Sequence, residues 1–249
     1  MKNTLIVACL LVLITSCSKG DKSKVNSETS DVNTTEVVEK TLFLTSSGMG
    51  VSSDWLVPLL PFEPTGKTVC YITTAATIGG EVPDWITSEI GAIEKLGFNV
   101  KSIDLTFLSA EDLETAFSEC DLFWVCGGNT LYLLQEVRRS GFDAFLTKKI
   151  SDGTPYVGAS AGSILLGPDV EFERFACDIT QASDLTSFEG LNLFPFATYV
   201  HFDAPWAKGV YKDILKFSLD NSKAFITLKD SEFIYVKGDN WRVVEIAPE

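Results

Sequence analysis

A serine lies between two glycines in the segment Gly158-Ala159-Ser160-Ala161-Gly162. The G-x-S-x-G spacing is typical of a nucleophile elbow, a sharp strand-to-helix turn that needs small neighbours because side chains there would crowd the backbone. The apolar run 154–157 precedes this segment and the apolar run 164–166 follows it, as a buried strand and a helix would. The pattern predicts Ser160 as a nucleophile, and an ordinary tight turn is the alternative.

A serine nucleophile needs a base, and the chain contains a single histidine, His201. A histidine in an apolar setting such as Tyr199-Val200-His201-Phe202 is most often a packed ring with a satisfied hydrogen bond. If a histidine is the base, however, it must be His201. Spacing alone does not select the acid that would orient it. The candidates around it are Asp169, Glu171, Glu173, Asp178, Asp184 and Asp203.

A second polar turn, Cys126-Gly127-Gly128-Asn129-Thr130, ends another apolar run. Glycines allow backbone amides to approach a ligand closely, so Gly127 and Gly128 could form part of an oxyanion hole. Asn129 and Thr130 could bind substrate, or they could cap a helix that begins near Leu131. The capping turn is the more ordinary interpretation.

Strand-like and helix-like segments alternate from Thr41 onward, which predicts an α/β fold with three layers: a mostly parallel sheet with helices on both faces. Both polar turns follow expected strands, and ligands gather at the carboxyl ends of such strands. The expected strands are Thr41–Thr45, Thr68–Thr73, Val100–Leu105, Leu122–Cys126 and Tyr156–Gly158. The expected helices are Trp85–Leu96, ended by Gly97, Ala110–Phe117, capped by Ser109, and Lys208–Leu219. A closing hairpin is expected between Ala224–Leu228 and Glu232–Val236, followed by Trp241–Glu245.

Composition limits the classes of partner and cofactor. The formal net charge of −14 would repel a phosphate backbone, so no nucleic acid is expected to bind. Cysteine and histidine form no cluster with metal-ligand spacing, so no metal and no other cofactor is expected. Cys70 and Cys126 lie in strand-like runs and are expected to be buried free thiols. The oligomeric state does not follow from the sequence.

The N-terminus has the pattern of a targeting segment. Lys2 precedes an apolar stretch too short to span a bilayer, and Leu13-Ile14-Thr15-Ser16-Cys17 resembles a bacterial lipobox. We therefore expect a signal peptide at 1–16, a lipid-modified Cys17, a flexible polar tether at 17–40 and a catalytic domain at 41–249. This organisation implies an exported bacterial lipoprotein held at a membrane, on the periplasmic or cell-surface face. An ordinary secretory signal is the alternative.

Four motifs in chain order resemble the peptidase E and cyanophycinase family of serine hydrolases, whose fold is like that of class I glutamine amidotransferases. They are Leu42 to Ser46 with Tyr71 to Ala76, Gly127 to Thr130, Gly158 to Ser163, and Gly190 to Pro195 leading to His201. The resemblance implies Ser160 as nucleophile and His201 as base. It also implies the amides of Ala161, Gly127 and Gly128 as oxyanion donors, and Asp178 as the orienting acid.

The resemblance implies a serine-type peptidase that hydrolyses short peptides through an acyl-enzyme, in the manner of a dipeptidase or aminopeptidase. Aspartyl specificity in that family needs an arginine after the histidine, whereas the only cations in residues 203–212 are Lys208 and Lys212, and a point charge does not reproduce a bidentate fork. This argues against aspartyl specificity. Two alternatives stay open: an esterase of α/β-hydrolase type, whose histidine usually lies further along the chain, and a catalytically silent surface binding protein.

Overall fold

The computed structural model of the protein describes residues 39–48 and 55–246. The expected signal peptide, the lipidation site Cys17 and all but the last two residues of the expected tether lie outside these ranges. Within them, no helix has both the length and the apolar character needed to cross a membrane.

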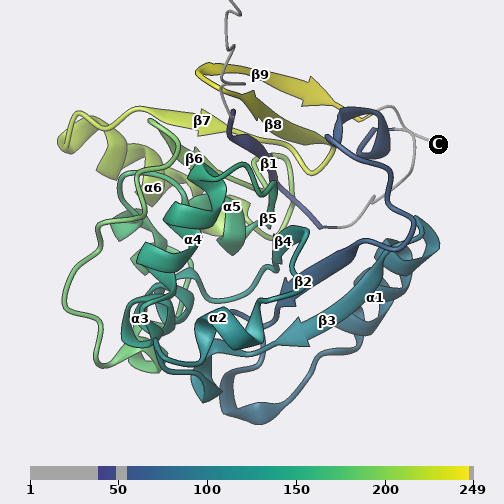
Figure 1. Ribbon diagram of the computed structural model, residues 1–249. Coiled ribbons are helices and arrows are strands. Elements are labelled where there is room, and N and C mark those ends of the chain that lie inside the picture. The colour runs from purple at the N-terminus through teal and green to yellow at the C-terminus, as the bar shows by residue number, and fades with distance from the viewer. Residues whose placement is uncertain (1–38, 49–54, 247–249) are drawn as a thin grey trace, which may run out of the picture. The chain divides into compact units, whose positions relative to one another are not determined.

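Seven strands form the central sheet in the order β3-β2-β4-β5-β1-β8-β9 (Figure 1). The first five are parallel, and β8 and β9 form an antiparallel hairpin that pairs with β1. Their bounds are β1 Thr41–Thr45, β2 Thr68–Ile72, β3 Asn99–Ile103, β4 Leu122–Val125, β5 Tyr156–Ala159, β8 Glu232–Lys237 and β9 Asn240–Glu245. The five parallel strands lie within two residues of the bounds expected from the sequence.

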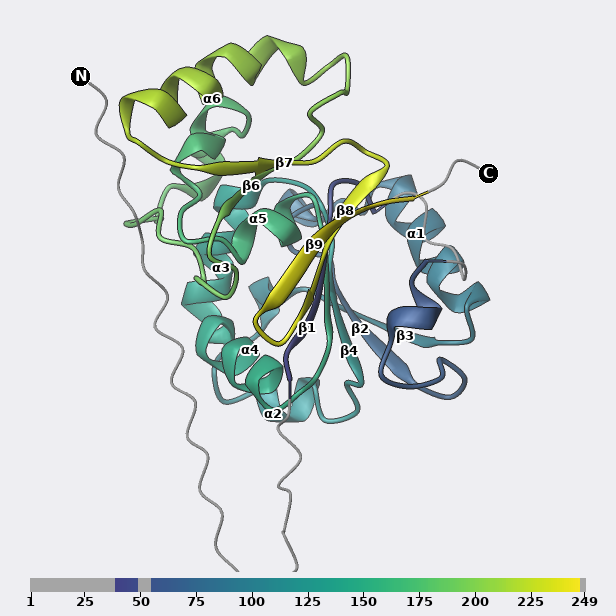
Figure 2. The same ribbon diagram turned by 90° about the horizontal axis from the view of Figure 1, so that it is seen from above.

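Helices cover both faces of this sheet, as the alternating pattern predicts. Figure 2 shows α1 on one face and α3, α4 and α5 on the other. Every residue of β1, β4 and β5 is buried, because a parallel strand covered on both sides has no solvent-facing side. The helices are α1 Asp84–Lys95, α2 Leu113–Ala116, α3 Thr130–Ser140, α4 Phe142–Ser151, α5 Ala161–Leu165 and α6 Lys208–Asp220.

The ends of two helices test the capping predictions. After α1 the chain turns at Gly97, whose φ of 103° suits glycine, as expected. The expected start of α2 at Ala110 with a Ser109 cap is wrong. Both the amide and the hydroxyl of Ser109 donate to the Asp112 carboxylate, at 2.8 and 2.7 Å, so this stretch forms a polar turn and the helix begins after it.

The expected hairpin between 224–228 and 232–236 is also wrong. The strand β7 (Phe225–Thr227) instead pairs in parallel with β6 (Ala197–Tyr199) in a separate two-stranded sheet. The next strand, β8, joins the central sheet. Leu228 extends the smaller pairing, because its amide donates to the Tyr199 carbonyl at 2.8 Å. The segment 228–231 therefore carries the chain from one sheet to the other.

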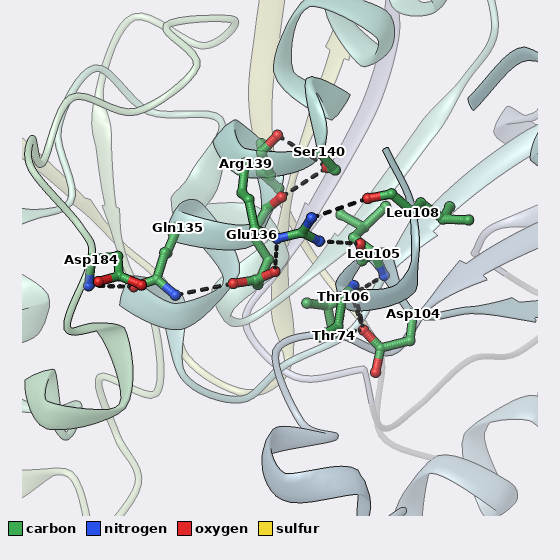
Figure 3. A network of polar contacts seen from close by, with 11 residues as sticks. Thr74, Asp104, Leu105, Thr106, Leu108, Gln135, Glu136, Arg139, Ser140 and Asp184 are labelled. Carbon is green, nitrogen blue, oxygen red and sulfur yellow. Dashed lines mark hydrogen bonds and ion pairs between the residues drawn. The ribbon is translucent and has the colours of Figure 1, made fainter. Parts of the chain in front are cut away.

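A polar network fixes α3 to the loops that follow β2 and β3 (Figure 3). Arg139 donates to the buried Glu136 carboxylate at 2.5 Å and to the Leu105 carbonyl at 2.6 Å. The Leu105 amide donates to the Thr74 hydroxyl, which in turn donates to Asp104 at 3.0 Å. The network therefore fixes the second half of α3 to these two loops.

Candidate active site

The serine of the G-x-S-x-G segment lies at the tip of a sharp turn between β5 and α5. Ser160 has φ 49° and ψ −105°, a conformation that L residues rarely adopt. Its amide donates to the Thr45 carbonyl at 3.1 Å, which ties the turn to the end of β1. A side chain at Gly162 would collide with the Val125 backbone. The structure therefore has the backbone of a nucleophile elbow and explains its small neighbours.

His201 faces this serine. Its Nε2 atom lies 3.0 Å from Ser160 Oγ, within hydrogen-bond distance, and its side chain is 17% exposed. His201 also has a positive φ of 57°, and its backbone amide donates to the buried Ser46 hydroxyl at 2.7 Å. The chain's one histidine is thus held beside Ser160 by a residue that follows β1.

The acid that contacts the imidazole is Asp230. Its Oδ1 lies 2.6 Å from His201 Nδ1 and accepts a hydrogen bond from the Ser46 hydroxyl at 3.0 Å. The Asp230 amide donates to the Asp203 carboxylate at 3.1 Å. Ser46 therefore binds both the backbone of the histidine and the side chain of the acid, and it fixes their relative positions.

The structure does not bring Asp178 to the histidine, so the assignment that the resemblance implied is corrected. Asp178 caps a short 3₁₀ turn at Ile179–Ala182, and its exposed carboxylate accepts from the amide and hydroxyl of Thr180 at 2.9 and 2.7 Å. These hydrogen bonds, first the hydroxyl and then the amide, lower the pKa of Asp178. Sequence reasoning missed Asp230 because its candidates extended no further along the chain than Asp203. The available signal was an acid placed just after the expected strand 224–228.

The glycine turn after β4 lies against the serine. An added side-chain carbon at Gly127 would stand 3.2 Å from Ser160 Cβ, and one at Gly128, whose φ is 136°, would collide with the Ala75 carbonyl. Among the hydrogen bonds of the described residues, none uses the backbone amides of Gly127, Gly128 or Ala161. These are the three amides that the resemblance implied as oxyanion donors.

Asn129 and Thr130 serve the structure rather than the pocket. The Asn129 side chain accepts from the amides of Leu131 and Tyr132 at 3.0 and 3.1 Å, which caps α3. Thr130 is fully buried and donates to Glu173 at 2.8 Å. The capping alternative therefore describes Asn129, and neither residue lines the pocket.

A pocket of about 530 Å³ opens beside the serine and the histidine. Among the described residues that line it there is no lysine or arginine, and Lys208 and Lys212 lie exposed on α6 instead. Its lining residues are Ser47, Gly48, Trp85, Glu89, Gly127, Gly128, Ala159, Ser160, His201 and Trp206. Within the described ranges, no group of three or more histidine, cysteine or acidic residues could hold a metal ion.

The α/β fold and the aligned serine, histidine and aspartate define the class of a serine hydrolase. The chain belongs to peptidase family S51, whose family model matches residues 42–244. It is therefore a serine-type peptidase with the fold of that family.

Individual relatives agree with this assignment. An uncharacterized peptidase of Listeria monocytogenes is 33% identical over 202 residues, which cover 80% of this chain and 95% of that protein. A peptidase E of Streptomyces coelicolor is 27% identical, with 78% of each chain covered. A crystal structure assigned to peptidase E from Listeria monocytogenes matches with a TM-score of 0.75 and 29% identity, over 84% of this chain and 100% of that one.

Proposed function

We propose that the protein hydrolyses short peptides through an acyl-enzyme formed on Ser160. The observation that carries this proposal is the line of contacts from Asp230 through His201 to Ser160, which ends at the pocket. A carboxylate can only accept a hydrogen bond, so Asp230 holds the imidazole proton on Nδ1 and leaves the Nε2 lone pair facing the serine hydroxyl.

The chemical steps follow from this geometry. His201 Nε2 takes the Ser160 proton as Oγ bonds to the carbonyl carbon of the scissile amide. The negative charge that develops on the carbonyl oxygen is stabilised by the amides of Gly127, Gly128 and Ala161. The C–N bond then breaks, and Nε2 gives its proton to the leaving amine. A water molecule deprotonated by His201 attacks the ester, and Oγ recovers the proton.

The dimensions and walls of the pocket support a short peptide as substrate. A volume of about 530 Å³ accommodates a few residues. The described part of its lining carries no cation, which argues against an aspartate side chain at this position. The alternative of an α/β-hydrolase esterase is not favoured, because the acid follows the histidine here, whereas that class has the order serine, acid, histidine.

Removal of the Ser160 hydroxyl tests the proposal. Ser160→Ala deletes one oxygen at a turn held by backbone contacts, so the thermal unfolding midpoint should change little. Peptide hydrolysis and covalent labelling by a fluorophosphonate should both fall by several orders of magnitude. An unchanged hydrolysis rate in this variant would show that another group carries the reaction.

We also propose that the protein is a lipoprotein anchored to a membrane through Cys17. The proposal rests on the lipobox-like sequence, and the polar residues 18–40 would hold the peptidase domain away from the lipid. We expect the wild type to partition into a detergent phase and Cys17→Ser to remain in the aqueous phase. Aqueous partitioning of both proteins would contradict the lipid anchor.

A further inference from the structure

Glu89, one of the described residues that line the pocket beside Ser160, is an acid that the proposed mechanism does not use. Glu89 lies on α1, and only 6% of its surface is exposed. Trp85, which also lines the pocket, is four residues earlier on the same helix, so the two side chains share one helix face. A carboxyl group and an indole therefore face the pocket together.

The two oxygens of Glu89 have different surroundings. Oε2 accepts a short hydrogen bond from the buried Tyr71 hydroxyl. Oε1 is buried, and no group within residues 39–48 and 55–246 forms a hydrogen bond to it. A side-chain carbon added to Gly48, another lining residue, would collide with Oε1. The unpaired oxygen thus lies directly against Gly48, a position that only glycine leaves free for it, and both residues line the pocket.

An unpaired buried acceptor costs free energy, and a ligand that supplies a donor recovers that cost. The rest of the lining selects the kind of donor. Trp206 also lines the pocket, so a second indole borders it. Its side chain is 71% exposed, and the centroid of its ring lies 4.7 Å from the centroid of the His201 ring. Aromatic faces and a carboxylate together attract cations, and the net charge of −14 would draw them toward the protein.

We propose that Glu89 receives a positively charged group of the substrate and thereby determines the specificity of the Ser160 site. The group is an ammonium or guanidinium, supplied either by the free N-terminus of a short peptide or by a lysine or arginine side chain. This inference rests on the peptidase function proposed above.

The ionisation of Glu89 gives the proposal a pH signature. Burial raises its pKa, and hydrogen bonding from Tyr71 opposes the shift. The Trp124 indole is close enough to oppose it as well, although it forms no hydrogen bond of ordinary geometry. Below the raised pKa the group is neutral and no longer attracts a cation. The preference for a charged over a neutral substrate should therefore grow as pH rises through this pKa. Effects that are common to both substrates cancel in the ratio of their kcat/KM values.

Four anilide substrates test the proposal on the full-length protein in detergent: lysine and norleucine derivatives, each with a free and with an acetylated N-terminus. Lysine and norleucine differ chiefly in side-chain charge. Glu89→Gln keeps the shape and an acceptor for Tyr71 but removes the charge. Glu94→Gln is the matched control, because Glu94 is an exposed residue of the same helix. Protection of Ser160 from fluorophosphonate labelling by lysine amide gives a second measurement that does not need turnover.

We expect Glu89→Gln to lower kcat/KM by at least about tenfold for the substrates that carry the recognised cation, while acetyl-norleucine anilide changes less than about threefold. A loss that follows the free N-terminus identifies the α-ammonium, and a loss that follows lysine identifies the side chain. Lysine amide should protect the wild type and the Glu94→Gln variant, but not Glu89→Gln.

Equal losses on all four substrates, or equal protection of the wild type and the Glu89→Gln variant, would overturn the proposal and leave Glu89 a structural role. A failure of the peptidase function itself would give a different set of results. In that case Ser160→Ala would match the wild type in turnover and would still be labelled.

Discussion

Two residues of the candidate site, Ser160 and His201, have positive φ angles of 49° and 57° although neither is glycine. Such conformations cost about 1–3 kcal/mol each and persist where surrounding contacts hold them. Here the holding contacts come from the end of β1: the Thr45 carbonyl binds the Ser160 amide, and the Ser46 hydroxyl binds the His201 amide. The end of one central strand thus positions both Ser160 and His201, the proposed nucleophile and base.

The same geometry predicts that substitutions of Asp230 and Asp178 have different effects on kcat. Asp230→Asn should lower kcat by roughly 10³–10⁴-fold, because an amide at this position can favour the wrong imidazole tautomer. Asp178→Asn should change kcat by less than about threefold, because asparagine also caps a turn. Steady-state kinetics on one peptide substrate, with unfolding midpoints as a check on folding, measure both. A larger loss at Asp178 would show that the acid seen against the imidazole is not the one that orients it.

At the scale of elements, the pairing of β6 with β7 brings the histidine and the acid together. The register runs from Ala197 with Phe225 to Tyr199 with Thr227, so His201 and Asp230 follow the ends of neighbouring parallel strands. The elbow and the glycine turn likewise follow β5 and β4. The site is therefore assembled at the carboxyl ends of strands from two different sheets.

This arrangement explains which parts of the site the sequence predicts. The elbow, the glycine turn and the five parallel strands are encoded in contiguous runs of apolar and small residues, and their positions were expected. The strands β6 and β7 have three residues each. This is too short for an alternation of apolar and polar residues to indicate which strand each one pairs with. The sequence therefore favoured a hairpin between neighbouring segments, and Asp230 went unassigned. Whether Asn129 caps a helix or faces substrate is likewise decided by tertiary burial.

At the scale of the whole molecule, a chain with net charge −14 also buries acidic groups away from its surface. Glu89 and Glu173 each have 6% of their surface exposed, and burial raises the pKa of both carboxyls. Glu89 lines the pocket, where a positively charged ligand can offset the cost of burying its carboxylate. Glu173 does not line the pocket. Its carboxylate accepts a hydrogen bond from Thr130, the first residue of α3, at 2.8 Å and another from the Cys177 thiol at 3.5 Å. The second acid therefore affects the stability of the fold rather than the reaction.

Glu173→Gln should make stability less dependent on pH. The folded pKa of Glu173 lies above the unfolded one, so its contribution to stability is fully present below the unfolded pKa and is lost as pH rises through the folded pKa. Glutamine stays neutral and can still accept from Thr130. The variant should therefore gain stability relative to wild type as pH rises through this window, by at most about 1.4 kcal/mol per pH unit. Urea unfolding from pH 5 to 8 measures the difference, and the exposed Glu94→Gln variant controls for the lost charge. A stability difference that stays constant across this range would show that Glu173 ionises as easily in the folded protein as in the unfolded chain.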